Sequence, residues 1–64
     1  MFKEYMLVTA TEKINELVNK GCLGTIVFKY NCDIFEVEFF DDNKNTISIE
    51  TVSKNQIQEK DLSV

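Results

Sequence analysis

A chain of 64 residues has room for one small domain, because a chain of this size buries only about 60% of the surface that it exposes when unfolded. We therefore expect a single domain over residues 1–64 and no deep catalytic cavity. The formal net charge of −4 and the absence of arginine argue against direct binding of nucleic acid, which requires clustered basic residues. The same charge suits a basic protein partner.

The chain opens with a short apolar run at residues 6–8, which predicts a first strand over residues 5–9. This run is too short for the apolar part of a signal peptide. No later stretch approaches the roughly 20 apolar residues that a membrane-spanning helix needs. We therefore expect a cytoplasmic protein with no membrane partner.

Residues 11–20 permit two interpretations. Ile14, Leu17 and Val18 recur at the spacing of one helical face, and Thr11 is placed to cap a helix. The other interpretation is an irregular loop that the same apolar side chains anchor to the sheet. A segment of about ten residues is marginal for a helix without a large packing face, so we expect a loop with at most one helical turn.

A β-hairpin is predicted for the middle of the chain. Gly21 and Gly24 are expected to form the tight turn from which a strand over residues 23–30 begins. A turn at residues 31–33 leads to a second strand over residues 34–40, because Asn and Asp tolerate the left-handed backbone that hairpin turns require. A strand rather than a helix follows the glycines, so they do not predict a phosphate-binding loop.

The two cysteines, Cys22 and Cys32, are expected at opposite ends of the first strand of this hairpin. At a rise of about 3.3 Å per residue they would lie about 20 Å apart, and a disulfide needs Cα atoms within about 7 Å. Because the chain has no histidine and no Cys-x-x-Cys pair, a zinc site is not predicted either. We expect no cofactor.

The rest of the chain predicts two more strands. The alternation over residues 46–52 predicts a fourth strand with Ile47 and Ile49 facing inward, and a short 3₁₀ turn is expected around Ile57 before a last strand that begins at Leu62. Even strand spacing predicts an all-β fold, a small SH3-like five-stranded barrel with a long early loop. A β-sandwich needs more strands, and an OB-fold is usually longer.

Four segments of the chain, in this order, resemble a family of small uncharacterised bacterial SH3-like (KOW-like) barrel domains. The segments are Lys20-Gly21-Cys22-Leu23-Gly24-Thr25-Ile26-Val27, Phe35-Glu36-Val37-Glu38-Phe39, Thr46-Ile47-Ser48-Ile49 and Asp61-Leu62. The resemblance covers nearly the whole chain and implies an SH3-like barrel. Some relatives are encoded beside toxin-like genes, so it also implies an immunity or antitoxin role.

Acidic residues are predicted to gather on the outward face of the third strand, where they form a candidate partner-binding surface. With Phe35, Val37 and Phe39 facing inward, alternation places the intervening residues outward, and Glu50 is expected on a neighbouring strand with the same orientation. The candidate residues are Glu36, Glu38, Phe40, Asp41, Asp42 and Glu50.

We expect this surface to meet a basic toxin, such as a nuclease, with complementary charge that speeds association. One alternative is a solvated face that discourages aggregation. In another, Phe40 packs at a bulge instead of anchoring a partner.

These features predict a binding protein rather than an enzyme. No catalytic residue is assigned, because the paired carboxylates lie in no predicted cleft. We expect an immunity or antitoxin protein that neutralises a basic toxin by direct binding. The alternative is an SH3-, KOW- or Tudor-like adaptor in a ribonucleoprotein or another complex, and the oligomeric state is left open.

Overall fold

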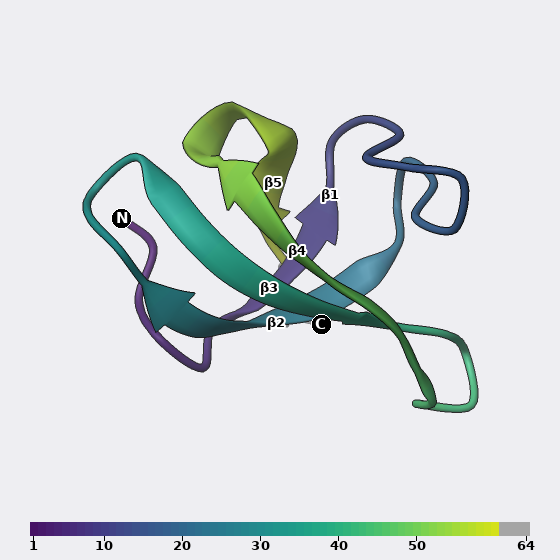
Figure 1. Cartoon of the computed structure of the whole chain (residues 1–64). Coiled ribbons are helices and arrows are strands. Elements are labelled where there is room, and N and C mark those ends of the chain that lie inside the picture. Colours follow the sequence, from purple (N-terminus) through teal and green to yellow (C-terminus); the bar gives the residue numbers. More distant parts are fainter. Residues whose placement is uncertain (61–64) are drawn as a thin grey trace.

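Five antiparallel strands form one sheet in a computed structural model that describes residues 1–60 (Figure 1). The strands are β1 (Leu7–Ala10), β2 (Leu23–Lys29), β3 (Ile34–Phe40), β4 (Thr46–Ser53) and β5 (Ile57–Glu59). Their order across the sheet is β4-β3-β2-β1-β5. The predicted all-β class is confirmed. Within residues 1–60 the sheet does not close on itself, so a barrel is not confirmed.

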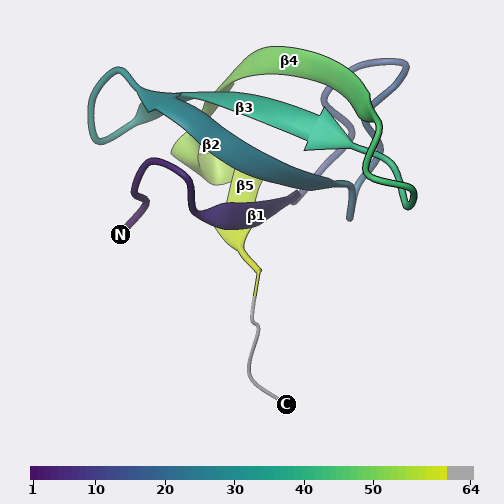
Figure 2. The same ribbon diagram turned by 90° about the horizontal axis from the view of Figure 1, so that it is seen from below.

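The sheet bends, so that its two ends face each other. In Figure 2, β3 and β4 form the upper part of the picture, and β1 and β5 form the lower part. The concave side holds the core: Val8, Ala10, Val18, Ile26, Phe35, Val37, Phe39, Val52 and Ile57. The inward positions predicted for β3 are confirmed, because Phe35, Val37 and Phe39 are all buried. Full burial of each such side chain contributes about 1.5–3 kcal/mol.

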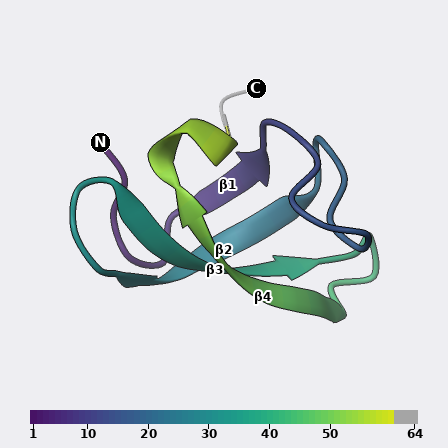
Figure 3. The same ribbon diagram turned by 45° about the horizontal axis from the view of Figure 1, so that its top comes forward.

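Residues 11–20 form an irregular loop without a helix, as predicted (Figure 3). The side-chain oxygen of Asn15 accepts hydrogen bonds from the backbone N–H groups of Leu17 at 2.8 Å and Val18 at 3.0 Å. This local turn sends Val18 into the core with an exposed fraction of 0%, whereas Leu17 is 62% exposed. Leu17 is therefore not the anchor that its spacing predicted.

The two glycines have different roles. Gly21 lies in the turn before β2 with a φ of +90°, a conformation that favours glycine. Gly24 lies inside β2, where it is paired with Val8 of β1 and Phe39 of β3. The prediction that both glycines form a turn is therefore wrong for Gly24, which serves close packing across the sheet.

A bulge reverses the orientation that was predicted for the start of β4. Phe39 pairs with Ser48 and Phe40 pairs with Thr46, so Ile47 is an extra residue on β4. Val52 is buried, and side chains alternate along a strand, so residues 50 and 48 also lie on the concave side. Ile49 is exposed on the other side. The prediction that Ile49 faces inward is therefore wrong, whereas Ile47, which was also predicted to face inward, is the half-buried residue of the bulge.

The chain after β4 makes the expected 3₁₀ turn, η1 (Lys54–Gln56), and then enters β5. The side chain of Gln56 accepts a hydrogen bond from the backbone N–H of Ser53 at 2.9 Å, which closes the turn. The prediction of a last strand that begins at Leu62 falls outside the described residues. Within them, β5 begins at Ile57, which pairs with Ala10. Within residues 1–60, no helix has the length and apolar character needed to cross a membrane.

Candidate functional site

The strand register sorts the side chains of β1 to β4 onto two faces. Residues that pair across antiparallel strands point to the same side, so the pairs join into rows. We call the convex side, opposite the core, the outer face. Its three rows are Thr9-Leu23-Phe40-Thr46, Leu7-Thr25-Glu38-Ile49 and Phe28-Glu36-Thr51.

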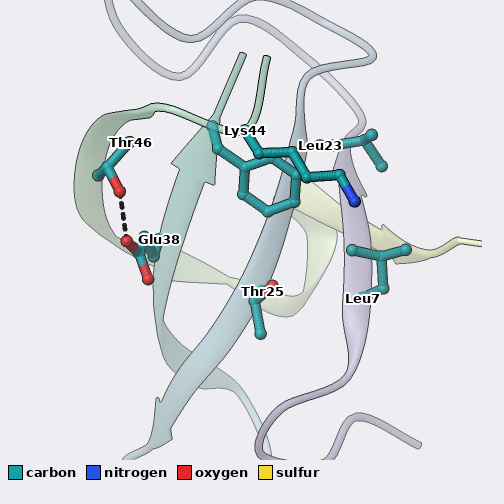
Figure 4. Close-up of a pocket in the computed structure, with 7 residues that line it drawn as sticks. Leu7, Leu23, Thr25, Glu38, Lys44 and Thr46 are labelled. Carbon is teal, nitrogen blue, oxygen red and sulfur yellow. Dashed lines mark hydrogen bonds between the residues drawn. The ribbon is translucent and has the colours of Figure 1, made fainter. Parts of the chain in front are cut away.

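An open pocket of about 330 Å³ lies on the outer face where β1, β2 and β3 meet the turn before β4 (Figure 4). It is lined by Leu7, Leu23, Thr25, Glu38, Phe40, Lys44 and Thr46. Figure 4 shows Lys44 extending toward Leu7, away from Glu38 and Thr46. This volume is at the lower end of the range for ligand pockets, about 300–1,000 Å³.

Hydroxyl groups hold Glu36 and Glu38 in place on the outer face. Thr51 Oγ1 donates a hydrogen bond of 2.6 Å to Glu36 Oε1, and Thr46 Oγ1 donates one to Glu38 Oε2. Neither carboxylate is in an ion pair: the pairs among residues 1–60 are Lys13–Glu16 and Lys54–Asp33. Two positioned negative charges therefore lie on one face without a cation to balance them.

Phe40 lies beside these acids and opposite the bulge of β4. It is half-buried, pairs with Leu23 and Thr46 on the outer face and lines the pocket. Two other apolar residues of this face, Phe28 and Ile49, are both exposed and were not among the predicted site residues. Each follows a bulge that shifts the alternation of its strand.

Glu50 does not share the orientation of Glu36 and Glu38. It pairs with Val37 and therefore points to the concave side of the sheet, where Ser48 donates a hydrogen bond to its carboxylate. The orientation predicted for Glu50 is wrong, because the bulge shifts the alternation of β4 by one residue. The outer face carries Ile49 and Thr51 at these positions of β4 instead.

Asp41 and Asp42 lie at the end of the outer face, in the turn between β3 and β4. Asp41 Oδ1 accepts hydrogen bonds from the backbone N–H groups of Asn43 and Asn45, both at 2.9 Å, so this carboxylate shapes the turn. Asp42 is exposed. A second pocket of about 360 Å³ separates both acids from the loop that carries Leu17.

Cys22 lines this second pocket, and its pKa is raised by burial and, to a smaller extent, by the charges of Asp41 and Asp42. A raised pKa leaves less thiolate at a given pH, and the thiolate is the nucleophile. Within the described chain, Cys22 and the exposed Cys32 are both free. Iodoacetamide at neutral pH should therefore alkylate Cys22 more slowly than Cys32, as peptide mass spectrometry would measure.

Asp42→Asn tests the electrostatic part of this expectation, because Asp42 is exposed and does not hold the turn. Loss of its charge lowers the pKa of Cys22 and should speed the alkylation of Cys22 but not that of Cys32. An unchanged rate at Cys22 would show that the charge of Asp42 does not contribute to its reactivity.

No group of three or more His, Cys, Asp or Glu side chains among residues 1–60 is arranged to hold a metal ion. The acidic residues of the outer face are spaced along strands and bound by hydroxyl donors instead. The outer face therefore carries charged and apolar side chains in neighbouring rows.

Comparison with family models places this surface in a known domain type. A model described as "Domain of unknown function (DUF4926)" matches residues 4–59, a segment that contains all five strands and the whole outer face. No significant match was found among curated proteins or among solved structures. Because the matched segment spans most of the chain, the protein belongs to the DUF4926 family.

Proposed function

We propose that this protein is an immunity or antitoxin protein, which neutralises a basic protein toxin by covering it with the outer face. One observation carries the proposal: Glu36 and Glu38 are fixed beside each other by hydroxyl groups and have no cation partner within residues 1–60. A partner with lysine or arginine at the matching positions would balance both charges. The resemblance described above supports a toxin as that partner.

Apolar residues around Glu36 and Glu38 meet the second requirement of a stable interface, which is a set of anchors that the partner can bury. Charge complementarity speeds encounter and excludes wrong partners, whereas most of the affinity comes from a few buried anchors. Phe28 and Ile49 flank the acids and are exposed, and Phe40 lines the pocket beside Glu38. These side chains are the candidate anchors.

The size of the molecule also suits this arrangement. A standard interface removes about 800 Å² of surface from each partner, about a fifth of the 4389 Å² that this chain exposes. The two longest dimensions of the molecule are 30 and 28 Å, and the third is 18 Å. One broad side of the sheet is therefore large enough for the whole interface.

The strand order and the 3₁₀ turn before β5 support an SH3-like architecture as part of this proposal. An adaptor on a ribonucleoprotein has less support, because the lysines are distributed over the whole chain and arginine is absent. The adaptor function is therefore the alternative outcome of the experiment below.

The test is capture of partners from nuclease-treated lysate by three forms of the protein: wild type, Glu36→Lys/Glu38→Lys, and a control with the same net charge, Glu16→Lys/Glu59→Lys. Both control residues are exposed and lie outside the outer face. We expect one basic protein to bind wild type and control, and to bind the outer-face variant at least ten-fold more weakly, which corresponds to about 1.4 kcal/mol. Thermal midpoints should agree within a few degrees.

The captured partner is then expressed alone and with each form of the protein. The proposal predicts that the partner stops growth, and that wild type and control restore growth while the outer-face variant does not. If the Glu36→Lys/Glu38→Lys variant still captures the partner at wild-type strength, the outer face is not the binding surface. Ribosomal or transcription proteins as partners, without toxicity, would establish the adaptor function instead.

A further inference from the structure

Two exposed aromatic rings lie next to each other where β2 runs into the β2–β3 turn. The ring centroids of Phe28 and Tyr30 are 4.8 Å apart, and the ring planes meet at 70°. Phe28 is 49% exposed and Tyr30 is 55% exposed, so the pair lies outside the core. A bulge between Ile26 and Phe28 brings Phe28 to the outer face. Exposed ring faces in such a pair carry negative electrostatic potential, which attracts cations.

A carboxylate completes this arrangement. Glu36 pairs with Phe28 across the sheet, and Tyr30 donates a hydrogen bond of 3.4 Å to Glu36 Oε1. Thr51 donates to the same oxygen at 2.6 Å. Both donors therefore act on Oε1, and among residues 1–60 no hydrogen bond is made to Oε2. The structure thus combines two ring faces and one carboxylate oxygen that can accept a bond from outside.

We propose that Phe28, Tyr30 and Glu36 form a binding site for the guanidinium group of an arginine on the partner. This inference rests on the proposed function and names the contact that its partner would make. A planar guanidinium stacks on an aromatic ring and donates to a carboxylate at the same time, which a lysine ammonium does less well. An apolar partner would bury the charge of Glu36 without a counter-charge, at a high cost.

The first test uses a small probe and the intact protein, so it does not depend on the partner. N-acetyl-arginine methylamide is titrated into the ¹³C-labelled protein, and the uncharged isostere N-acetyl-citrulline methylamide is the control. We expect arginine to shift the ring signals of Phe28 and Tyr30 and the methyl signal of Thr51, and citrulline to shift them at least three-fold less. Equal shifts with both probes, or shifts elsewhere only, would overturn the proposal.

Variants separate the site from general effects of the surface. Phe28→Leu, Tyr30→Leu and Glu36→Gln should each reduce the response to arginine at least three-fold. Leu17→Ala is the control, because Leu17 is exposed and lies beside Leu23, at the opposite end of β2 from Phe28, and it should leave the response unchanged. Unchanged responses in all three site variants would contradict the assignment.

Failure of this inference can be told apart from failure of the proposed function. If Phe28→Leu/Tyr30→Leu still captures the partner at wild-type strength while Glu36→Lys/Glu38→Lys does not, the arginine site is rejected and the outer face remains the interface. If Phe28→Leu/Tyr30→Leu also loses the partner and the arginine response, the site is supported as part of that interface.

Discussion

Gly24→Val is expected to destabilise the protein by about 3 kcal/mol, because the core side of β2 has no room for a side chain at this position. A Cβ on Gly24 would lie 2.7 Å from Val37 Cγ1, 2.8 Å from Phe39 Cδ1 and 3.1 Å from the carbonyl oxygen of Glu38. Val37 and Phe39 are themselves buried, and the third contact is backbone. The neighbours therefore have little freedom to move away.

Such a loss is large for a small domain, whose total stability is about 0.05–0.15 kcal/mol per residue. Urea unfolding followed by circular dichroism measures the change. Gly21→Ala is the comparison. A Cβ at this position meets nothing within 4 Å, but the backbone has a φ of +90°, which costs a residue with a side chain about 1–2 kcal/mol. A Gly24→Val protein with the wild-type midpoint would show that the core around β2 rearranges freely.

Val18→Asp should cost about 3–5 kcal/mol, because it places an uncompensated charge in the core. Val18 is fully buried although it belongs to an irregular loop, and it belongs to the same core cluster as Val8 and Ile26. Leu17 precedes it in the chain and is exposed. Leu17→Asp makes the same chemical change and should alter stability by no more than about 0.5 kcal/mol.

Thermal unfolding of the two variants gives the comparison directly. A low midpoint for Val18→Asp and a wild-type midpoint for Leu17→Asp would show that one residue of the loop anchors it to the sheet. Equal midpoints would contradict the packing of this loop. Because the two residues are neighbours, differences in local charge or in sequence context do not account for a difference between the variants.

The fold follows from the sequence wherever alternation is uninterrupted. β3 has the predicted bounds, and Phe35, Val37 and Phe39 are buried as predicted, because three large apolar residues at period two have only one favourable orientation. The outward positions of Glu36 and Glu38 follow from the same pattern. This part of the candidate site was therefore predictable from residues alone.

The bulges account for most of what the sequence did not predict. One lies between Ile26 and Phe28 and the other opposite Phe39 and Phe40, and each shifts the following residues to the other face. Alternation without a bulge would put Phe28 and Ile49 inside, although both are exposed. A bulge depends on register against the neighbouring strand, which local sequence does not specify.

One signal for close packing was present in the sequence. A glycine inside an apolar strand often marks a close approach of another segment, and Gly24 precedes the buried Ile26 by two residues. Its spacing from Gly21 suggested a shared turn instead. The short distances from a Cβ on Gly24 to Val37 and Phe39 distinguish the two roles, and they arise only from the folded sheet.

The most direct test of the outer face is methyl NMR of the labelled protein in complex with the partner that it captures. Leu7, Leu23 and Ile49 report on the outer face, whereas Leu17 reports on the loop and Ile57 on the core side. We expect the partner to shift or broaden the signals of Leu7, Leu23 and Ile49 and to leave Leu17 and Ile57 unchanged. Changes confined to Leu17 and Ile57 would contradict the assignment of the outer face as the binding surface.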